Sequence, residues 1–120
     1  MNARRKRIQF GEERFIEQIL AGCKTVTLCP AEDYDQPWGE YSDGGWLASD
    51  EVEVYDATGC LRGVIVVTQV QPITFGEAAT TLWREDGYNS YEDFIEDYRQ
   101  AWSDAQRNTV LIALHFYLLS

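Results

Sequence analysis

Lysine is scarce in this 120-residue chain, and one of its two lysines stands where a side chain could do acid–base chemistry. Lys24 follows a helical pattern that ends at Gly22 and precedes Thr25-Val26-Thr27. A threonine hydroxyl becomes an effective nucleophile only when a base removes its proton. A lysine is such a base only when burial or a nearby cation lowers its pKa. The alternative is that Lys24 is a solvated residue closing the helix, where the helix dipole favours a cation.

The spacing of Lys24 and Thr27 sets a condition on their cooperation. Strict alternation along a strand at 25–28 would place the two side chains on opposite faces. They can meet only if Lys24 lies in the turn before the strand, which Gly22 favours. A carboxylate within hydrogen-bonding distance could then protonate a leaving group. Glu85, in a turn made by Glu85-Asp-Gly-Tyr-Asn89, could project into a cleft; the alternative is an ordinary surface acid.

A long irregular stretch at 30–46 interleaves aromatic and acidic residues. Loops of this length in compact domains are commonly functional. Its aromatic rings could form a wall against which a planar base stacks, or they could fold back and cap the core. Both interpretations stay open for the residues that we consider for substrate binding, Trp38, Tyr41 and Trp46.

The remaining reactive residue types predict neither a metal site nor a cofactor. The chain has a single histidine and three cysteines, without a Cys-x-x-Cys spacing. We interpret His115, inside the apolar stretch 109–119, as a hydrogen-bonded structural residue. Cys23 and Cys29 flank the Lys24 motif without a neighbouring histidine and are interpreted as small apolar residues.

The charge distribution disfavours a long nucleic acid as the main ligand. Residues 4–7 hold four of the ten basic residues, and from Ile8 onward six basic residues face twenty acidic ones, a net charge of −14. Such a body repels a polyphosphate and offers no basic stripe from which counterions could be released. A small, uncharged or lightly charged nucleoside-type molecule suits it better. Without a membrane-length apolar run or a signal-peptide core, we expect a cytoplasmic protein.

The periodicities predict one α+β domain at 8–120 after a flexible basic tag at 1–7. Strands are expected at 7–10, 25–28, 51–55, 61–70 and 109–119, and Pro72 is expected to end the fourth. Helices are expected at 12–21, after Thr74 in a capping box, and after Ser90. We therefore predict a mostly antiparallel, curled sheet, with one helix after the first strand and a helix pair before the last.

The order of these features resembles the ASCH domain, a small relative of the PUA-like fold. The match lies in Phe15-Ile-Glu-Gln-Ile-Leu-Ala-Gly-Cys-Lys-Thr-Val-Thr-Leu28, which is similar to that family's helix, Gly-x-Lys-Thr-x-Thr motif and strand. It continues in the Glu-x-Gly turn at 85–87, the Ser90-led helix and the closing strand at 110–116. The resemblance implies a PUA-like curled β-barrel.

The small bacterial ASCH proteins that this chain resembles are amidohydrolases that remove the acetyl group from N(4)-acetylcytidine. The resemblance implies Lys24 as proton acceptor, Thr27 as nucleophile and Glu85 as proton donor, with Thr25 and Cys29 beside the substrate. The family usually carries an arginine where this chain has Cys29. The resemblance to other ASCH and PUA-like domains implies an alternative function for the protein. In that case it is a non-catalytic module that binds RNA or nucleotides, or a relative of ribonucleases.

Overall fold

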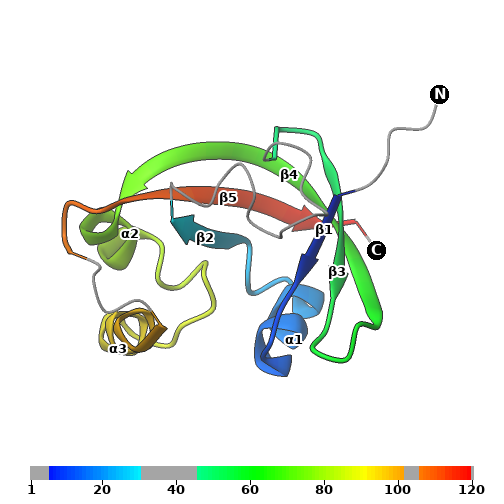
Figure 1. Ribbon diagram of the computed structural model, residues 1–120, viewed down its shortest axis with the longest axis horizontal. Coiled ribbons are helices and arrows are strands. Elements are labelled where there is room, and N and C mark those ends of the chain that lie inside the picture. Colours follow the sequence, from blue (N-terminus) through cyan, green and yellow to red (C-terminus); the bar gives the residue numbers. More distant parts are fainter. Residues whose placement is uncertain (1–5, 31–45, 102–105, 120) are drawn as a thin grey trace.

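The computed structural model describes residues 6–30, 46–101 and 106–119. In chain order, the elements are β1 (Lys6–Gln9), α1 (Glu13–Ala21), β2 (Val26–Pro30), β3 (Glu51–Tyr55), β4 (Leu61–Thr74), α2 (Phe75–Thr81), α3 (Tyr91–Ala101) and β5 (Val110–Leu118). The strands form one sheet in the order β1-β3-β4-β5-β2, with β1 parallel to β3 and the other neighbours antiparallel. In Figure 1 the sheet arches over the helices, with α2 and α3 beneath one end and α1 beneath the other. The predicted α+β domain with a mostly antiparallel, curled sheet is confirmed, and the five strands close it to a half-barrel.

Local sequence signals explain how the helices begin and end. α1 ends at Gly22, whose φ of 81° is the left-handed conformation that glycine adopts without strain. The Thr74 hydroxyl accepts a hydrogen bond from the Glu77 amide at 3.2 Å, as the capping-box spacing predicted. The Ser90 hydroxyl likewise accepts from the Asp93 amide at 3.1 Å at the start of α3.

Strand β4 is longer than predicted, and Pro72 lies within it rather than ending it. Pro72 pairs with Ile112 of β5. On the other side, β3 pairs only with Leu61–Val66, so the second half of β4 has no neighbour there among the described strands. A proline lacks an N–H, but that loss costs no ladder hydrogen bond along an open edge.

The first strand begins one residue before the predicted strand at 7–10. Lys6, assigned to the basic tag, lies in β1 with Arg7, and the two pair with Val52 and Glu53 of β3. The Lys6 ammonium lies 2.8 Å from the Asp50 carboxylate. Residues 1–5 lie outside the described ranges.

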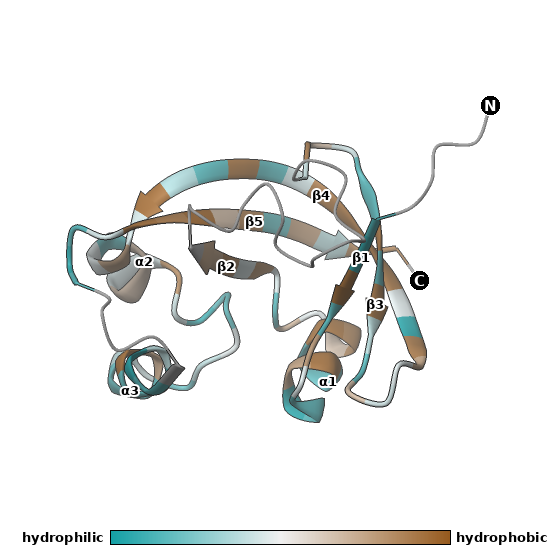
Figure 2. Cartoon of the chain, in the orientation of Figure 1, coloured by the Kyte–Doolittle hydropathy of each residue, from teal (hydrophilic) through white to brown (hydrophobic). Residues whose placement is uncertain are grey.

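Two apolar clusters hold the sheet and helices together. The first joins α1 to the barrel strands; its buried members are Ile8, Ile16, Ile19, Trp46, Val52, Val54, Ile65, Val67, Leu114 and Phe116. The second packs α2 and α3 under the other end of the sheet; its buried members are Phe75, Ala78, Ala79, Tyr88, Phe94 and Leu111. Figure 2 shows that β2 and the half of β5 near α2 are mostly hydrophobic. None of the helices in the described ranges is long and apolar enough to cross a bilayer.

The hairpin between β3 and β4 carries a pH-dependent contribution to stability. Asp56 accepts hydrogen bonds from the Thr58 hydroxyl at 2.6 Å and the Cys60 amide at 3.0 Å. These bonds, the Thr58 hydroxyl first, lower the pKa of Asp56 from 3.8 to about 2. A depressed carboxyl pKa stabilises the folded protein above the unfolded pKa, and the effect is lost as the pH falls through the folded value.

We therefore expect Asp56→Ala to lower the free energy of unfolding at pH 7, with the difference from wild type shrinking between pH 4 and pH 2. Urea unfolding at a series of pH values measures this. Asp56→Asn is the control, because it keeps an acceptor oxygen but removes the charge. A difference independent of pH would contradict the assignment to the carboxylate.

Candidate functional site

Lys24 is buried, with 3% of its surface exposed. Its ammonium nitrogen donates to the backbone carbonyls of Val26 and Asp86, each at 2.8 Å, and to Oδ1 of the Asp86 carboxylate. An ammonium group has three N–H donors, so these three acceptors satisfy it completely. The solvated interpretation of Lys24 is therefore wrong: the side chain lies inside the domain, paired with an acid.

Backbone hydrogen bonds fix this position from two sides. The amides of Cys23 and Lys24 donate to the carbonyl of Gln18 at 2.8 and 3.1 Å, so the end of α1 holds the chain in place. The amides of Thr25 and Val26 donate to the carbonyl of Glu85 at 2.8 and 3.2 Å, which docks the 85–87 turn against the start of β2. Because β2 begins at Val26, Lys24 lies before the strand, as its cooperation with Thr27 requires.

Asp86 is the carboxyl group that contacts Lys24. Its side chain is 2% exposed, and its second oxygen, Oδ2, accepts a hydrogen bond from the Tyr98 hydroxyl at 2.8 Å. Glu85, predicted as the acid, is half-buried and supplies its backbone carbonyl to β2. Glu85 and Asp86 are adjacent, so the sequence does not show which of them contacts Lys24. The turn motif indicates only that an acid of this segment could do so.

Strand register places Thr27 and His115 on opposite faces of the sheet. Thr27 pairs with Leu114, and paired residues of antiparallel strands share a face. Leu114 belongs to the first apolar cluster, so Thr27 faces that cluster. His115 pairs with Val26 on the opposite face. Burial lowers the pKa of His115, and the Glu85 charge opposes that shift. The carboxylate in contact with Lys24 is that of Asp86, so the geometry favours Asp86 over Glu85 as the acid beside Lys24.

Burial acts on both members of the Lys24–Asp86 pair. Desolvation lowers the pKa of Lys24, and the Asp86 charge opposes that shift. Desolvation raises the pKa of Asp86, and the Lys24 charge opposes it. Both shifts bring the pKa values of the two groups closer together, so a proton passes from Lys24 to Asp86 more easily than it would in water. The Lys24 nitrogen also lies 5.0 Å from the Phe15 ring centre, within the range of a cation–π interaction.

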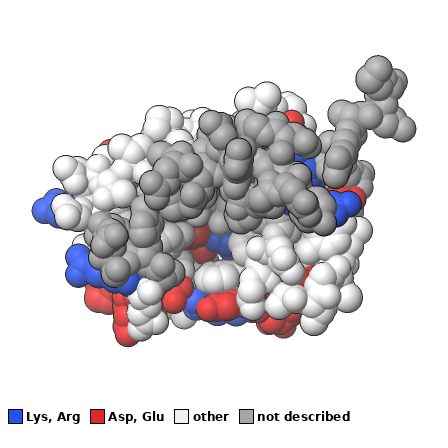
Figure 3. Space-filling model, in the orientation of Figure 1, with Lys and Arg blue, Asp and Glu red and all other residues white. Residues whose placement is uncertain are grey.

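A second polar network borders this pair between α1 and α3. The Arg14 guanidinium contacts Asp97 at 3.1 Å, and the Tyr88 hydroxyl donates to the same carboxylate at 2.5 Å. A cavity of about 310 Å³ opens here, lined by Arg14, Tyr88, Asp93, Glu96, Asp97 and Gln100. In Figure 3, charged side chains of both signs lie in the recess between the two helical ends of the molecule. The Tyr88 ring of this network lies 6.0 Å from the ring of Tyr98, whose hydroxyl contacts Asp86.

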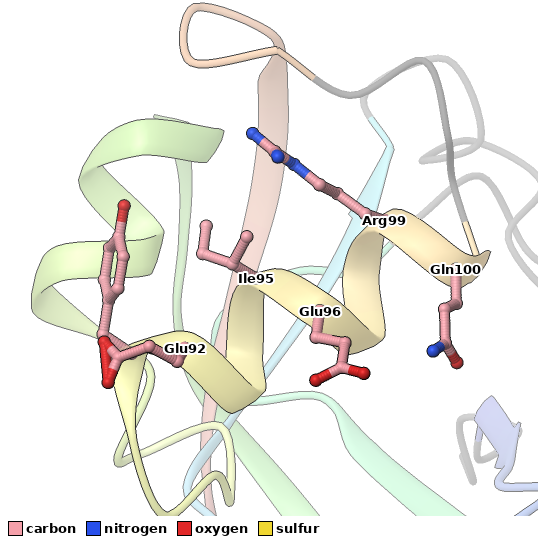
Figure 4. A pocket seen from close by; sticks show the side chains of 6 residues that line it. Glu92, Ile95, Glu96, Arg99 and Gln100 are labelled. Carbon is pink, nitrogen blue, oxygen red and sulfur yellow. The ribbon is translucent and has the colours of Figure 1, made fainter.

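A larger depression, of about 470 Å³, lies on the outward face of α3. Figure 4 shows that its side chains diverge: Glu96 and Gln100 point to one side of the helix and Arg99 to the other. Since no polar groups converge on a common point, this surface lacks the arrangement that catalysis needs.

The remaining predicted site residues separate into distinct environments. Thr27 is 8% and Cys29 7% exposed, and alternation along β2 places both on one face. Thr25 is half-buried. Trp46, proposed for stacking on a base, is 1% exposed and belongs to the first apolar cluster. For this residue the core-capping interpretation is correct. Trp38 and Tyr41 lie outside the described residues.

His115 and the cysteines have simple surroundings in the described part of the chain. His115 Nε2 is hydrogen-bonded to the Gln71 side chain at 2.8 Å. Cys23, Cys29 and Cys60 form no disulfide among the described residues. Over the ranges 6–30, 46–101 and 106–119, no group of three or more His, Cys, Asp or Glu side chains could hold a metal ion.

Gly87 is the residue of the turn least able to accept a side chain. Its φ is 97°, and an added Cβ would lie 2.1 Å from Oε1 of Gln18, whose Nε2 donates to the Gly87 carbonyl at 2.8 Å. We expect Gly87→Ala to destabilise the protein by about 1–3 kcal/mol, since backbone strain adds to displacement of the Gln18 amide and loss of its hydrogen bond to the Gly87 carbonyl. Gly59→Ala is the control: its φ is 86° with open space around it, so a loss of only about 1 kcal/mol is expected. Urea unfolding measures both, and equal losses would contradict the packing argument.

Comparison with known proteins places this arrangement in a structural class. No family model and no curated protein sequence matches the chain. A protein of Enterococcus faecalis V583, described by the family model DUF984, superimposes with a TM-score of 0.72 at 11% identity, over 99% of this chain and 83% of that one. The ASCH domain of Lactobacillus crispatus JV V101 gives 0.71 at 15% identity, over 94% and 79%.

The ASCH protein of Zymomonas mobilis is similar as well. It superimposes with a TM-score of 0.60 at 16% identity, over 92% of this chain and 64% of its own. Identities this low carry the backbone architecture and leave the chemistry to be argued from this chain's own residues. The chain has the PUA-like fold of the ASCH domains.

Proposed function

We propose that this protein is an amidohydrolase that removes the acyl group from N(4)-acetylcytidine or a related acylated nucleoside. The observation that carries the proposal is the buried Lys24–Asp86 pair, held at the entrance of the strand that bears Thr27. An amine and a carboxylic acid in contact supply a general base and a general acid from one shared proton. The acylated-nucleoside substrate comes from the resemblance of the Gly22–Thr27 motif to that of the ASCH amidohydrolases.

Acylation begins once Lys24 has passed a proton to Asp86, which leaves an amine beside a carboxylic acid. Lys24 takes the proton of the Thr27 hydroxyl as the oxygen attacks the acetyl carbonyl carbon. The carbon–nitrogen bond breaks, and Asp86 protonates the departing exocyclic nitrogen of cytosine. The products are cytidine, an acetyl ester on Thr27, an ammonium at Lys24 and a carboxylate at Asp86.

Deacylation restores the starting state. The Asp86 carboxylate takes a proton from water as the water attacks the ester carbonyl. The Lys24 ammonium returns a proton to the Thr27 oxygen as acetic acid leaves. The pair is again an amine and a carboxylic acid, so the cycle conserves protons and requires no other cofactor.

A second candidate is a non-catalytic module that binds a base or nucleotide. The observation that favours it is the complete hydrogen-bonding of Lys24, whose three acceptors are all supplied by the protein. In that case the pair organises the turn and β2 without taking part in chemistry.

Hydrolysis of N(4)-acetylcytidine by the purified protein, followed by ultraviolet absorbance, tests the proposal. The control is Thr27→Val, which keeps the shape of the side chain and removes the hydroxyl. Release of cytidine that disappears in the variant is the expected result. Absence of release at high enzyme concentration, together with cytidine binding in calorimetry, would replace hydrolysis with the binding module.

A further inference from the structure

Tyr98 occupies a special position behind the candidate site. Its hydroxyl donates to Oδ2 of Asp86 at 2.8 Å, while Oδ1 of the same carboxylate receives the Lys24 ammonium. Among the described residues, these two side chains are the donors to the Asp86 carboxylate. Asp86 is 2% exposed, so an oxygen that lost its partner could not turn to bulk water instead.

We infer that Tyr98 is a positioning residue, which fixes the Asp86 carboxylate in the orientation that reaches Lys24. This inference rests on the proposed function only for its catalytic consequence. The contact itself is a property of the folded protein and can be tested without any substrate.

The aromatic cluster explains why the Tyr98 hydroxyl has a fixed position. Its ring stacks on Phe94 with the centres 4.5 Å apart and the planes at 28°. Phe75 meets it edge-on at 6.1 Å and 83°, and the Tyr88 ring lies 6.0 Å away. Rings held on several sides have few rotamers available, so α3 presents the hydroxyl to Asp86 in one geometry.

The charges around the pair determine the direction of the expected effect. A hydroxyl donor stabilises the Asp86 carboxylate, and burial keeps the pKa of Tyr98 well above its usual range, so it remains a donor. The Asp97 charge raises the pKa of Asp86, and the Arg14 charge lowers that of Lys24. Without the Tyr98 hydroxyl the charged form of Asp86 is less stable relative to the protonated form. Lys24 then loses part of the negative charge that raises its pKa.

The chain offers a matched control in Tyr88. Tyr88 lies in the same aromatic cluster, and its hydroxyl also donates to a carboxylate, that of Asp97. Tyr88→Phe therefore removes one hydroxyl and one hydrogen bond from the same region without touching Asp86. A general loosening of the cluster would affect Lys24 in both variants, whereas positioning through Asp86 requires Tyr98.

The experiment uses the scarcity of lysine. Protein labelled with ¹³C,¹⁵N-lysine gives signals from Lys6 and Lys24 alone, and Lys6→Arg assigns them. The Lys24 Cε shift is followed against pH in wild type, Tyr98→Phe and Tyr88→Phe. We expect Tyr98→Phe to lower the Lys24 midpoint by about one pH unit, the size of a lost hydrogen bond to a charged group, and Tyr88→Phe to leave it nearly unchanged.

Equal shifts in both variants, or none in Tyr98→Phe, would overturn the inference. Should the midpoint lie outside the pH range of the folded protein, the Nζ shift at pH 7 is compared, since it depends on the charge of Lys24 and on the position of the carboxylate that contacts it. An unchanged Nζ shift in Tyr98→Phe would then overturn the inference. A protein that does not hydrolyse N(4)-acetylcytidine can still show the Tyr98 effect, so the two proposals fail separately.

Discussion

Lys24→Arg is expected to lower kcat/KM for N(4)-acetylcytidine by about 10³-fold, the usual range for removing a general base. Arginine keeps the positive charge beside Asp86, but its guanidinium does not deprotonate in proteins and cannot take the Thr27 proton. The loss therefore reports chemistry rather than the missing charge. Steady-state hydrolysis followed by absorbance measures it, with circular dichroism to verify the fold. Activity within a few-fold of wild type would exclude Lys24 as the base.

Lys24→Met separates the structural role of this lysine from the chemical one. Removing one partner of a buried ion pair typically costs about 3–5 kcal/mol, because the other charge is left without compensation. The double variant Lys24→Met, Asp86→Asn removes that charge and keeps an acceptor for Tyr98. We expect it to regain most of the lost stability in urea unfolding while remaining inactive. Recovered activity in the double variant would contradict the mechanism.

Asp86→Asn is expected to lower kcat/KM by about 10²–10³-fold, whereas Glu85→Gln should leave it within a few-fold of wild type. Asparagine keeps the size of Asp86 and an oxygen for Tyr98, but it cannot supply the proton that the leaving nitrogen needs. The two variants change neighbouring residues of one turn by the same chemical step. A difference between them thus depends on which carboxyl group faces Lys24.

Kinetics of the two variants, measured in parallel, decide between the acids. Loss of activity in Glu85→Gln with full activity in Asp86→Asn would restore Glu85 as the proton donor and make the Lys24–Asp86 contact structural. In active Asp86→Asn protein, the acidic limb of the pH profile should move to lower pH, because the Asp86 charge raises the pKa of Lys24. A limb that moves to higher pH would contradict Lys24 as the group that must be neutral.

Local physics in the sequence accounts for most elements of the fold. Gly22 ends α1 because it is free to adopt a positive φ, and Thr74 and Ser90 start helices because their hydroxyls satisfy unpaired amides. The alternation of Glu51–Tyr55 predicts a half-buried strand. Each of these features depends on a few neighbouring residues, so the pattern alone is sufficient. Lys24, as a lone lysine between helix and strand, could be selected on the same basis.

The tertiary structure decided the roles of residues whose neighbours in space are far away in the sequence. Pro72 lies within β4 because β3 pairs only with the first half of that strand. No described strand on that side requires an N–H from residue 72, so a proline is tolerated there. Trp46 is a core residue because α1 and the barrel strands surround it. Neither neighbourhood can be read from the residues next to Pro72 or Trp46 in the chain.

The choice between Glu85 and Asp86 is the clearest division between the two sources. The sequence by itself determined that a lysine, a threonine and an acid of the 85–87 turn are candidates for one site. Two adjacent carboxylates are equivalent in composition, charge and turn propensity, so no local rule separates them. Docking of the turn onto β2, through the amides of Thr25 and Val26, orients Asp86 toward Lys24 and buries the pair. That orientation is set by long-range hydrogen bonds, which exist only once the chain has folded.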